Sequence, residues 1–211
     1  MNYKKKISEI KSEAKRAKLV IVTKNQQINN IQTIYNLGER HFGENRVQEL
    51  LNKHKQLPKD IKWHMIGHLQ TNKVKFIIPF IYLIQSVDSM KLLKKINSSA
   101  LIHKRKVNCL LQIKISNDKS KFGFESKEVI QILKSNYKSE FPNINIRGVM
   151  GMSSLTSNTD QIKCEFESIS QILNLLNSKN KILSIGMSND YKIAHEAGSN
   201  MIRIGSYIFK E

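Results

Sequence analysis

The chain has 211 residues, a net charge of +18 and only two cysteines. This length fits one domain with a buried core of its own. No apolar run approaches the roughly 20 residues that a membrane-spanning helix needs, and the N-terminus carries no secretion-signal pattern. We therefore expect a cytoplasmic protein without membrane contact. Cys109 and Cys164 lack metal-ligand spacing and are expected to be small buried hydrophobes, which suits a reducing compartment.

The positive charge is dispersed along the chain. Of the 35 basic residues 29 are lysine and 6 are arginine, and lysine occurs in every segment. Asn and Ile are also abundant, which indicates a general compositional bias. The clusters of arginine and aromatic residues that recognise phosphates and bases are missing. We expect no specific nucleic-acid partner, although the charge favours anionic ligands such as phosphate esters.

Short β-branched runs alternate with longer segments of helical period. Residues 1–17 are predicted to form an amphipathic helix that packs on the outside of the domain, because Ile7, Ile10, Ala14 and Ala17 recur at helical spacing. Strands are predicted at residues 18–23, 40–43, 62–67, 81–87, 107–115, 145–152, 182–187 and 201–205. Helices are predicted at residues 28–37, 47–54, 72–76, 90–103, 127–139, 161–176 and 191–197.

Eight strands alternating with helices indicate a parallel sheet, and eight is the number that closes a barrel. A doubly wound open sheet is the competing fold, and it usually has a glycine-rich loop after its first strand. Residues 20–26 contain no glycine. We therefore predict one α/β domain over residues 1–211, a single (β/α)₈ TIM barrel, whose site lies at the carboxyl ends of the strands.

Lys24 follows the apolar residues 19–22, so it is placed at the end of the first strand. Partial burial there would lower its pKa and favour a Schiff base with an aldehyde. The competing interpretation is an ordinary surface lysine. Position alone favours that interpretation in a chain with so many lysines.

Ser188 and the pair Gly205–Ser206 follow the seventh and eighth predicted strands, whose loops often form the phosphate site of this fold. Hydroxyls and free backbone N–H groups suit a phosphate monoester. A helix beginning near Asn189 would direct its N-terminal amides toward the same place. Ordinary loop chemistry explains these residues equally well.

Arg203 alternates with two isoleucines and points into the barrel if those pack against helices. An inward arginine needs an acceptor, which is either a carboxylate such as Glu44 or Asp88 or a ring nitrogen of a ligand. His64 is more often a satisfied core residue than a catalyst at such a position. Met187 is expected to be an adaptable pocket wall, and no metal site is expected.

Several motifs stand in a compatible order and spacing. They are HFGEN at 41–45 with VQE at 47–49, WHMIG at 63–67 with LQTNK at 69–73, SKFG at 120–123, IRGVM at 146–150, LSIGMSND at 183–190, and the stretch from Ala197-Gly198 to Arg203-Ile204-Gly205-Ser206. On these motifs the chain resembles the pyridoxal phosphate homeostasis protein family, single-domain relatives of the alanine racemase barrel. The resemblance runs from about Leu19 to Phe209.

The resemblance implies that the barrel binds pyridoxal 5′-phosphate (PLP). Lys24 matches the lysine that holds PLP covalently, and Arg203 matches the arginine that faces the pyridine nitrogen. The phosphate-binding positions are matched by Ser188, Gly205 and Ser206, with Met187 beside them. Other positions that line the cofactor are matched by Asn45, His64 and Ile66.

The chain departs from the family pattern at a few positions. Thr23 stands for a serine, Asn25 begins an unusual continuation after the lysine, and Arg46 stands for an aromatic residue. His68 stands for a proline, Ser206 stands for a threonine, and both termini are short. None of these changes removes a ligand-type residue.

The family implies a PLP-binding protein of vitamin B6 homeostasis, without robust catalysis. We expect a monomer that holds PLP as a Schiff base on Lys24, with PLP-dependent apo-enzymes as candidate partners. A weak PLP-dependent racemase-type enzyme is the alternative, although the sequence marks no acid–base pair for it. A polyanion-binding protein driven by the +18 charge ranks third.

Overall fold

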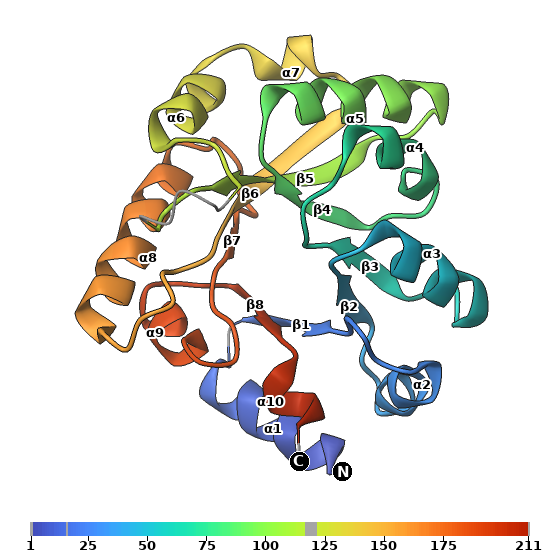
Figure 1. Ribbon diagram of the computed structural model, residues 1–211. Helices are drawn as coiled ribbons and strands as arrows, with labels where there is room; N and C mark the ends of the chain where they lie inside the picture. The colour runs from blue at the N-terminus through green and yellow to red at the C-terminus, as the bar shows by residue number, and fades with distance from the viewer. Residues whose placement is uncertain (1, 16, 117–121, 211) are drawn as a thin grey trace.

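The computed structural model describes residues 2–15, 17–116 and 122–210. Its strands form a closed barrel in sequence order, all of them parallel, with the last strand paired to the first (Figure 1). The predicted barrel is confirmed and the open sheet is excluded. The strands are β1 (Lys18–Val22), β2 (His41–Glu44), β3 (Lys62–Met65), β4 (Leu83–Val87), β5 (Val107–Ile113), β6 (Ile144–Gly151), β7 (Ile182–Ser184) and β8 (Met201–Ile204).

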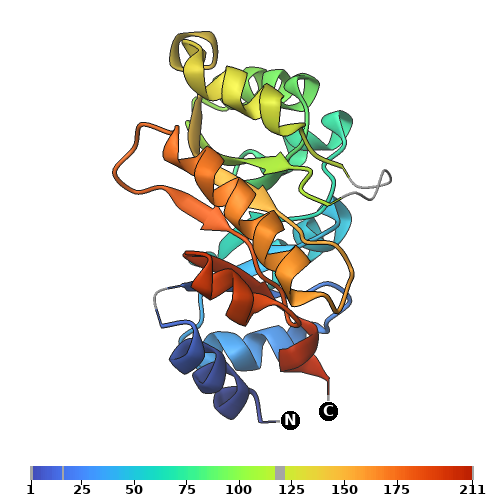
Figure 2. The ribbon, with the colours of Figure 1, turned by 90° about the vertical axis from the view of Figure 1, so that its left-hand side faces the viewer.

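Helices surround the barrel, as the view along its axis and the view turned by 90° both show (Figures 1 and 2). They are α1 (Tyr3–Glu13), α2 (Ile28–Asn36), α3 (Val47–Gln56), the 3₁₀ turn η1 (Thr71–Lys73), α4 (Val74–Ile77), α5 (Met90–Ile102), α6 (Ser126–Lys134), α7 (Tyr137–Glu140), α8 (Thr159–Asn174), α9 (Tyr191–Glu196) and α10 (Ser206–Phe209). Among the described residues, none of these helices is long and apolar enough to cross a membrane.

Several elements differ in their bounds from the sequence prediction, and three differences affect the course of the chain. The single helix predicted at residues 127–139 is two helices, because Ser135 between them is extended. The seventh strand ends at Ser184 rather than at residue 187, and Gly186 turns the chain there with a φ of +95°. The four-residue helix α10 was not predicted, since it is too short to show a helical period.

The alternation of the strands divides the core into two layers. Outward side chains such as Phe42, Trp63 and Ile84 pack against the helices. A small inner cluster fills the barrel and consists of Val20, Leu83, Leu110, Met150 and Met201. Polar side chains share this interior, among them His64, Gln85, Ser184 and Arg203. The barrel interior is therefore partly polar and needs hydrogen-bond partners.

The two ends of the described chain lie side by side, where α1 packs against α10 (Figures 1 and 2). Tyr3 of α1 meets Phe209 edge to face, with ring centroids 5.7 Å apart. Ile7 and Ile10 of α1 are buried at their helical spacing. This packing fixes the position of the segment that follows β8.

The cysteines have different environments. Cys109 on β5 is fully buried, and burial raises the pKa of its thiol. Cys164 on α8 is exposed, which corrects the expectation that both are buried. Cys164 lies two residues from Ile162 and two from Phe166, the buried side chains of its helix, so it points away from the barrel.

Candidate functional site

A cavity of about 460 Å³ lies at the carboxyl ends of β1, β6, β7 and β8, within the usual size range of small-molecule sites. Six of the nine sequence-predicted residues line it: Lys24, Met187, Ser188, Arg203, Gly205 and Ser206. Asn45, His64 and Ile66 are not part of its lining. The barrel thus brings the candidate covalent lysine, phosphate ligands and arginine to one cavity.

Lys24 lies in a tight turn after β1. The N–H of Gln26 donates to the carbonyl of Thr23 at 3.0 Å, and Asn25 has a left-handed φ of +59°. Asn tolerates this conformation better than most residues, which gives the unusual Asn25 a structural reason. The Lys24 side chain is exposed, so the partial burial expected for it is not found.

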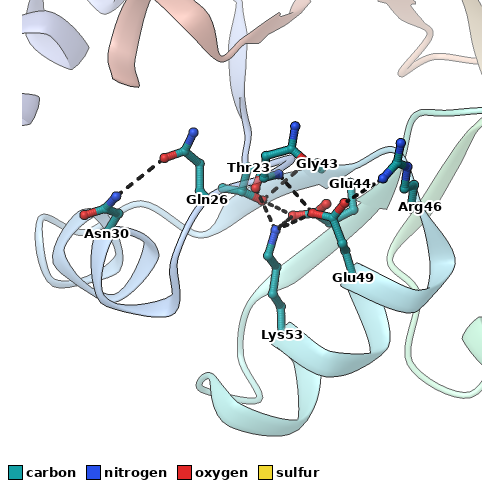
Figure 3. A network of polar contacts seen from close by, with 9 residues as sticks. Thr23, Gln26, Asn30, Gly43, Glu44, Arg46, Glu49 and Lys53 are labelled. Carbon is teal, nitrogen blue, oxygen red and sulfur yellow. Dashed lines mark hydrogen bonds and ion pairs between the residues drawn. The ribbon is translucent and has the colours of Figure 1, made fainter. Parts of the chain in front are cut away.

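A buried ion-pair network stabilises the turn that contains Lys24 (Figure 3). The ammonium of Lys53 on α3 donates to the carbonyl of Thr23 and to Glu44 Oε1, both at 2.7 Å, and to Glu49 Oε2 at 3.1 Å. Glu49 Oε2 also accepts the N–H of Asn25 at 2.9 Å. The two residues that flank Lys24 are therefore tied to helix α3.

Burial sets the protonation of this network. Burial raises the pKa of Glu44, and the hydrogen bonds from Lys53 and Thr23 oppose that rise. Burial also acts on Glu49, but the Asn25 N–H and the Lys53 ammonium lower its pKa overall. The sequence analysis missed Lys53, although its spacing of four residues from Glu49 on a helix is the signal of such a pair.

Arg203 is buried in the barrel interior, as the alternation of β8 predicts. Its Nη1 donates to the carbonyl and to the hydroxyl of Ser184, both at 2.7 Å, and its Nη2 donates to the carbonyl of Gly151 at 2.9 Å. The proposed partners Glu44 and Asp88 do not pair with it. They pair with Lys53 and His68.

The guanidinium keeps donors for a ligand. Of its five N–H groups three have acceptors among the described residues, which leaves Nε–H and one Nη2–H. Burial lowers the pKa of Arg203 to about 10, and the charge of Asp190 opposes that fall. Arg203 is therefore a fixed cation at neutral pH.

A chain of hydrogen bonds leads from Arg203 through the barrel. The hydroxyl of Ser184 donates to Gln85 Oε1 at 2.7 Å, and Gln85 Nε2 lies 2.9 Å from His64 Nδ1. His64 Nε2 lies 2.9 Å from His41 Nδ1 at the opposite end of the barrel. His64 is thus a satisfied core residue that reaches the cavity through Gln85 and Ser184.

These contacts define the tautomers of both histidines. Because Gln85 donates to His64 Nδ1, the proton of His64 lies on Nε2 and is donated to His41. Burial lowers the pKa of His64 well below its usual range, and the charges of His41 and Lys62 add to the effect. Burial is the main cause that lowers the pKa of His41 to about 4, and the positive charges of Lys18 and Lys62 lower it further.

The other side of the cavity carries hydroxyl groups. The Ser206 hydroxyl donates to Ser188 Oγ at 2.9 Å, and the N–H of Tyr207 donates to the same oxygen at 3.3 Å. Glycine suits position 205, since a Cβ would lie only 3.0 Å from the Cβ and the carbonyl oxygen of Val22. Two hydroxyls and a backbone N–H therefore converge on one point of the lining.

Asp190 ends the motif at 183–190 and lies directly before the helix predicted at 191–197. It is buried at the N-cap of α9, where Oδ1 accepts the N–H of Met187 at 2.5 Å and Oδ2 accepts the hydroxyl of Ser153 at 2.6 Å. Its carboxylate accepts no N–H group of α9, which begins at Tyr191, and instead binds the segments before α9 and after β6.

The remaining predicted residues lie at the ends of β2 and β3. Asn45 and Ile66 are half-buried there, and Gly67 packs directly on the backbone of Asn45. His68 pairs with Asp88 at 2.7 Å and stacks on Phe122. In the motif at 120–123, Ser120 and Lys121 lie outside the described residues.

Comparisons with known proteins agree with the fold. The family model described as "Alanine racemase, N-terminal domain" matches residues 2–211. The pyridoxal phosphate homeostasis protein of Helicobacter pylori (strain ATCC 700392 / 26695) is 32% identical over 223 residues, covering all of both chains. Among solved structures, PipY of Synechococcus elongatus PCC7942 without PLP has a TM-score of 0.89 at 29% identity, covering 97% of this chain and 98% of that chain.

The same relative has been solved with PLP bound. That structure has a TM-score of 0.85 at 28% identity, covering 98% of this chain and 99% of that chain. The match to the homeostasis protein spans the full length of both chains, and the match to the racemase model spans the barrel. The chain therefore belongs to the pyridoxal phosphate homeostasis protein family, built on the alanine racemase N-terminal domain.

Proposed function

We propose that this protein binds PLP in the cavity at the carboxyl ends of its strands and takes part in vitamin B6 homeostasis. Lys24 Nζ would condense with the aldehyde carbon of PLP, with release of water, to form a Schiff base. The hydroxyls of Ser188 and Ser206 would donate to the phosphate. The free N–H donors of Arg203 would donate a hydrogen bond to the pyridine nitrogen.

One observation carries the proposal: an amine, a pair of hydroxyls and a fixed cation line a single cavity. The chemistry of this donor set fits the cofactor, because PLP presents an aldehyde, a phosphate and a ring nitrogen as an acceptor. Arg203 holds its charge, so it would keep the ring nitrogen unprotonated. Bound PLP supplies a reactive aldehyde that can exchange with free amines.

The lining favours a carrier over an enzyme. A racemase needs proton-transferring groups on both faces of its substrate. Among the described residues that line the cavity, Lys24, Asp190 and Arg203 are the ones with ionisable side chains, and Arg203 holds its proton. Asp190 already accepts hydrogen bonds from Met187 and Ser153. Leu155 at the rim is 97% exposed, so the cavity opens to solvent and to exchange.

Two measurements test this function. A PLP titration followed by absorbance should saturate at one site, and Lys24→Ala should abolish the new band whereas Lys55→Ala, on the exposed side of α3, should not. Exchange of the alanine α-proton in D₂O separates the carrier from the racemase-type alternative. A carrier exchanges no faster than free PLP, and exchange that requires Lys24 would support the enzyme. Transfer to PLP-dependent apo-enzymes, a monomeric state and a cytoplasmic location stay predictions.

A further inference from the structure

The N-terminal end of the barrel, opposite the proposed PLP site, holds a second concentration of polar groups. A cavity of about 400 Å³ lies there, lined by residues from several strands and from the segment before β7. The lining residues that carry polar groups are Lys18, His41, Tyr82, Arg147, Lys179, Asn180, Lys181 and Asn200. None of the lining residues is acidic.

The basic groups come from different parts of the fold. Lys18 begins β1, Arg147 lies in β6, and Lys181 precedes β7. Lys62, the first residue of β3, lies next to this cavity, with its ammonium 5.4 Å from the ring centroid of Tyr82. Barrel closure alone brings these cations together, so their convergence does not follow from a local lysine-rich stretch.

These cations are not neutralised within the described structure. No described carboxylate lies within ion-pair distance of Lys18, Lys62, Arg147, Lys179 or Lys181. The adjoining cavity of about 540 Å³, which shares Lys18 and His41, contains Glu39. Glu39 is already paired with Lys11. The Lys181 ammonium donates to the carbonyl of Asn174 at 3.0 Å, which is an uncharged acceptor, so the positive charge around the cavity is not compensated by a described carboxylate.

Neutral donors and apolar contacts complete this end of the barrel. His41 accepts the proton of His64 at Nδ1, so its own proton lies on Nε2. Tyr82 contacts the rings of both histidines, with centroid distances of 5.4 Å. Ile182 and Met201 add apolar surface at the floor of the cavity.

We propose that this cavity, the basal cavity, binds a small phosphate-bearing anion. Lysine ammonium groups and an arginine fork are the side chains that hold phosphate oxygens, and a cavity of this size has room for an ester group beyond the phosphate. A concave site with converging cations suits a small dianion better than a polymer, which needs an extended basic face. The site is separate from the proposed PLP cavity and does not depend on it.

Assigned backbone amide signals of Lys18, Lys62 and Lys181 test the proposal by NMR. Inorganic phosphate, added at constant ionic strength against chloride, should shift these signals along a saturable curve. Arg147→Gln with Lys181→Gln should weaken binding about tenfold, which is ~1.4 kcal/mol. The matched control Lys94→Gln with Lys95→Gln removes the same charge from the exposed side of α5 and should leave the affinity unchanged.

Two further comparisons make the result decisive. Ser188→Ala with Ser206→Ala should not change the response of the Lys18, Lys62 and Lys181 amide signals to phosphate, because the PLP cavity lies at the other end of the barrel. Neither Arg147 nor Lys181 belongs to the buried core, and the pair of substitutions removes one described hydrogen bond, from Lys181 to Asn174, so R147Q/K181Q is expected to fold. Shifts that never saturate, an equal response of R147Q/K181Q and wild type, or binding of an oligonucleotide without binding of phosphate would each overturn the proposal.

Discussion

Lys53→Met tests the ion-pair network beneath the Lys24 turn. The substitution keeps the apolar stem and removes the ammonium, which leaves the fully buried carboxylate of Glu44 without its cation. Removing one partner of a buried pair costs about 3–5 kcal/mol. That is a large part of the ~5–15 kcal/mol that stabilises a typical domain. Urea denaturation at pH 7 measures the loss.

The pH dependence of this loss follows from Glu44. Burial already raises the pKa of Glu44, and without Lys53 the rise is larger. A carboxyl with a raised folded-state pKa binds its proton more tightly when folded, so stability is lost as pH rises above the unfolded value of about 4.3. The deficit of K53M should therefore be largest near neutral pH and shrink as pH falls toward that value.

Two variants control the experiment. Lys55→Met lies on the same helix and is exposed, so it should change stability by no more than about 0.5 kcal/mol. Glu44→Gln combined with K53M removes the uncompensated charge and should recover part of the loss. A loss below about 1 kcal/mol in K53M, or a deficit that does not change with pH, would refute the account of the network.

The remaining predictions concern the two ends of the barrel. Ser188→Ala with Ser206→Ala should raise the Kd for PLP about a hundredfold in equilibrium dialysis, since two hydrogen bonds to a charged phosphate are lost; an unchanged Kd would contradict the phosphate assignment. Gly205→Ala should lower the free energy of unfolding in urea by about 1–3 kcal/mol because of the contact with Val22. An unchanged free energy of unfolding would show that the strands can separate there. His41 should titrate near pH 4 by ¹⁵N NMR, so its contribution to stability falls as pH drops from 6.5 toward 4; a midpoint near 6.5 would mean that it is not buried as described.

Local sequence patterns predict the barrel and part of its site. Strand and helix periods are local properties, and the rule that barrel sites lie at the carboxyl ends of strands is enough to group Lys24, Ser188 and Arg203. The burial of Lys24 could not be predicted in the same way. The exposure of this side chain depends on how far the loops after several strands cover the turn. In the structure these loops leave Lys24 exposed.

The interior contacts depend on barrel closure. Ser184 and Gln85 are 99 residues apart in the sequence yet share a hydrogen bond of 2.7 Å. No local pattern indicates that Arg203 would use backbone carbonyls and Ser184 instead of a carboxylate. The pairing of Lys53 with Glu44 joins a helix to the strand before it, and only the i,i+4 partner Glu49 was visible on the helix itself.

Borohydride reduction followed by peptide mass mapping shows whether Lys24 is the residue that holds PLP. The protein is mixed with less than one equivalent of PLP, reduced and digested, so that the adduct reports the preferred lysine among the 29 of the chain. Our account predicts a single pyridoxyl adduct on the peptide that contains Lys24, and its loss in Lys24→Ala. Adducts spread over surface lysines, or an undiminished yield in Lys24→Ala, would contradict it.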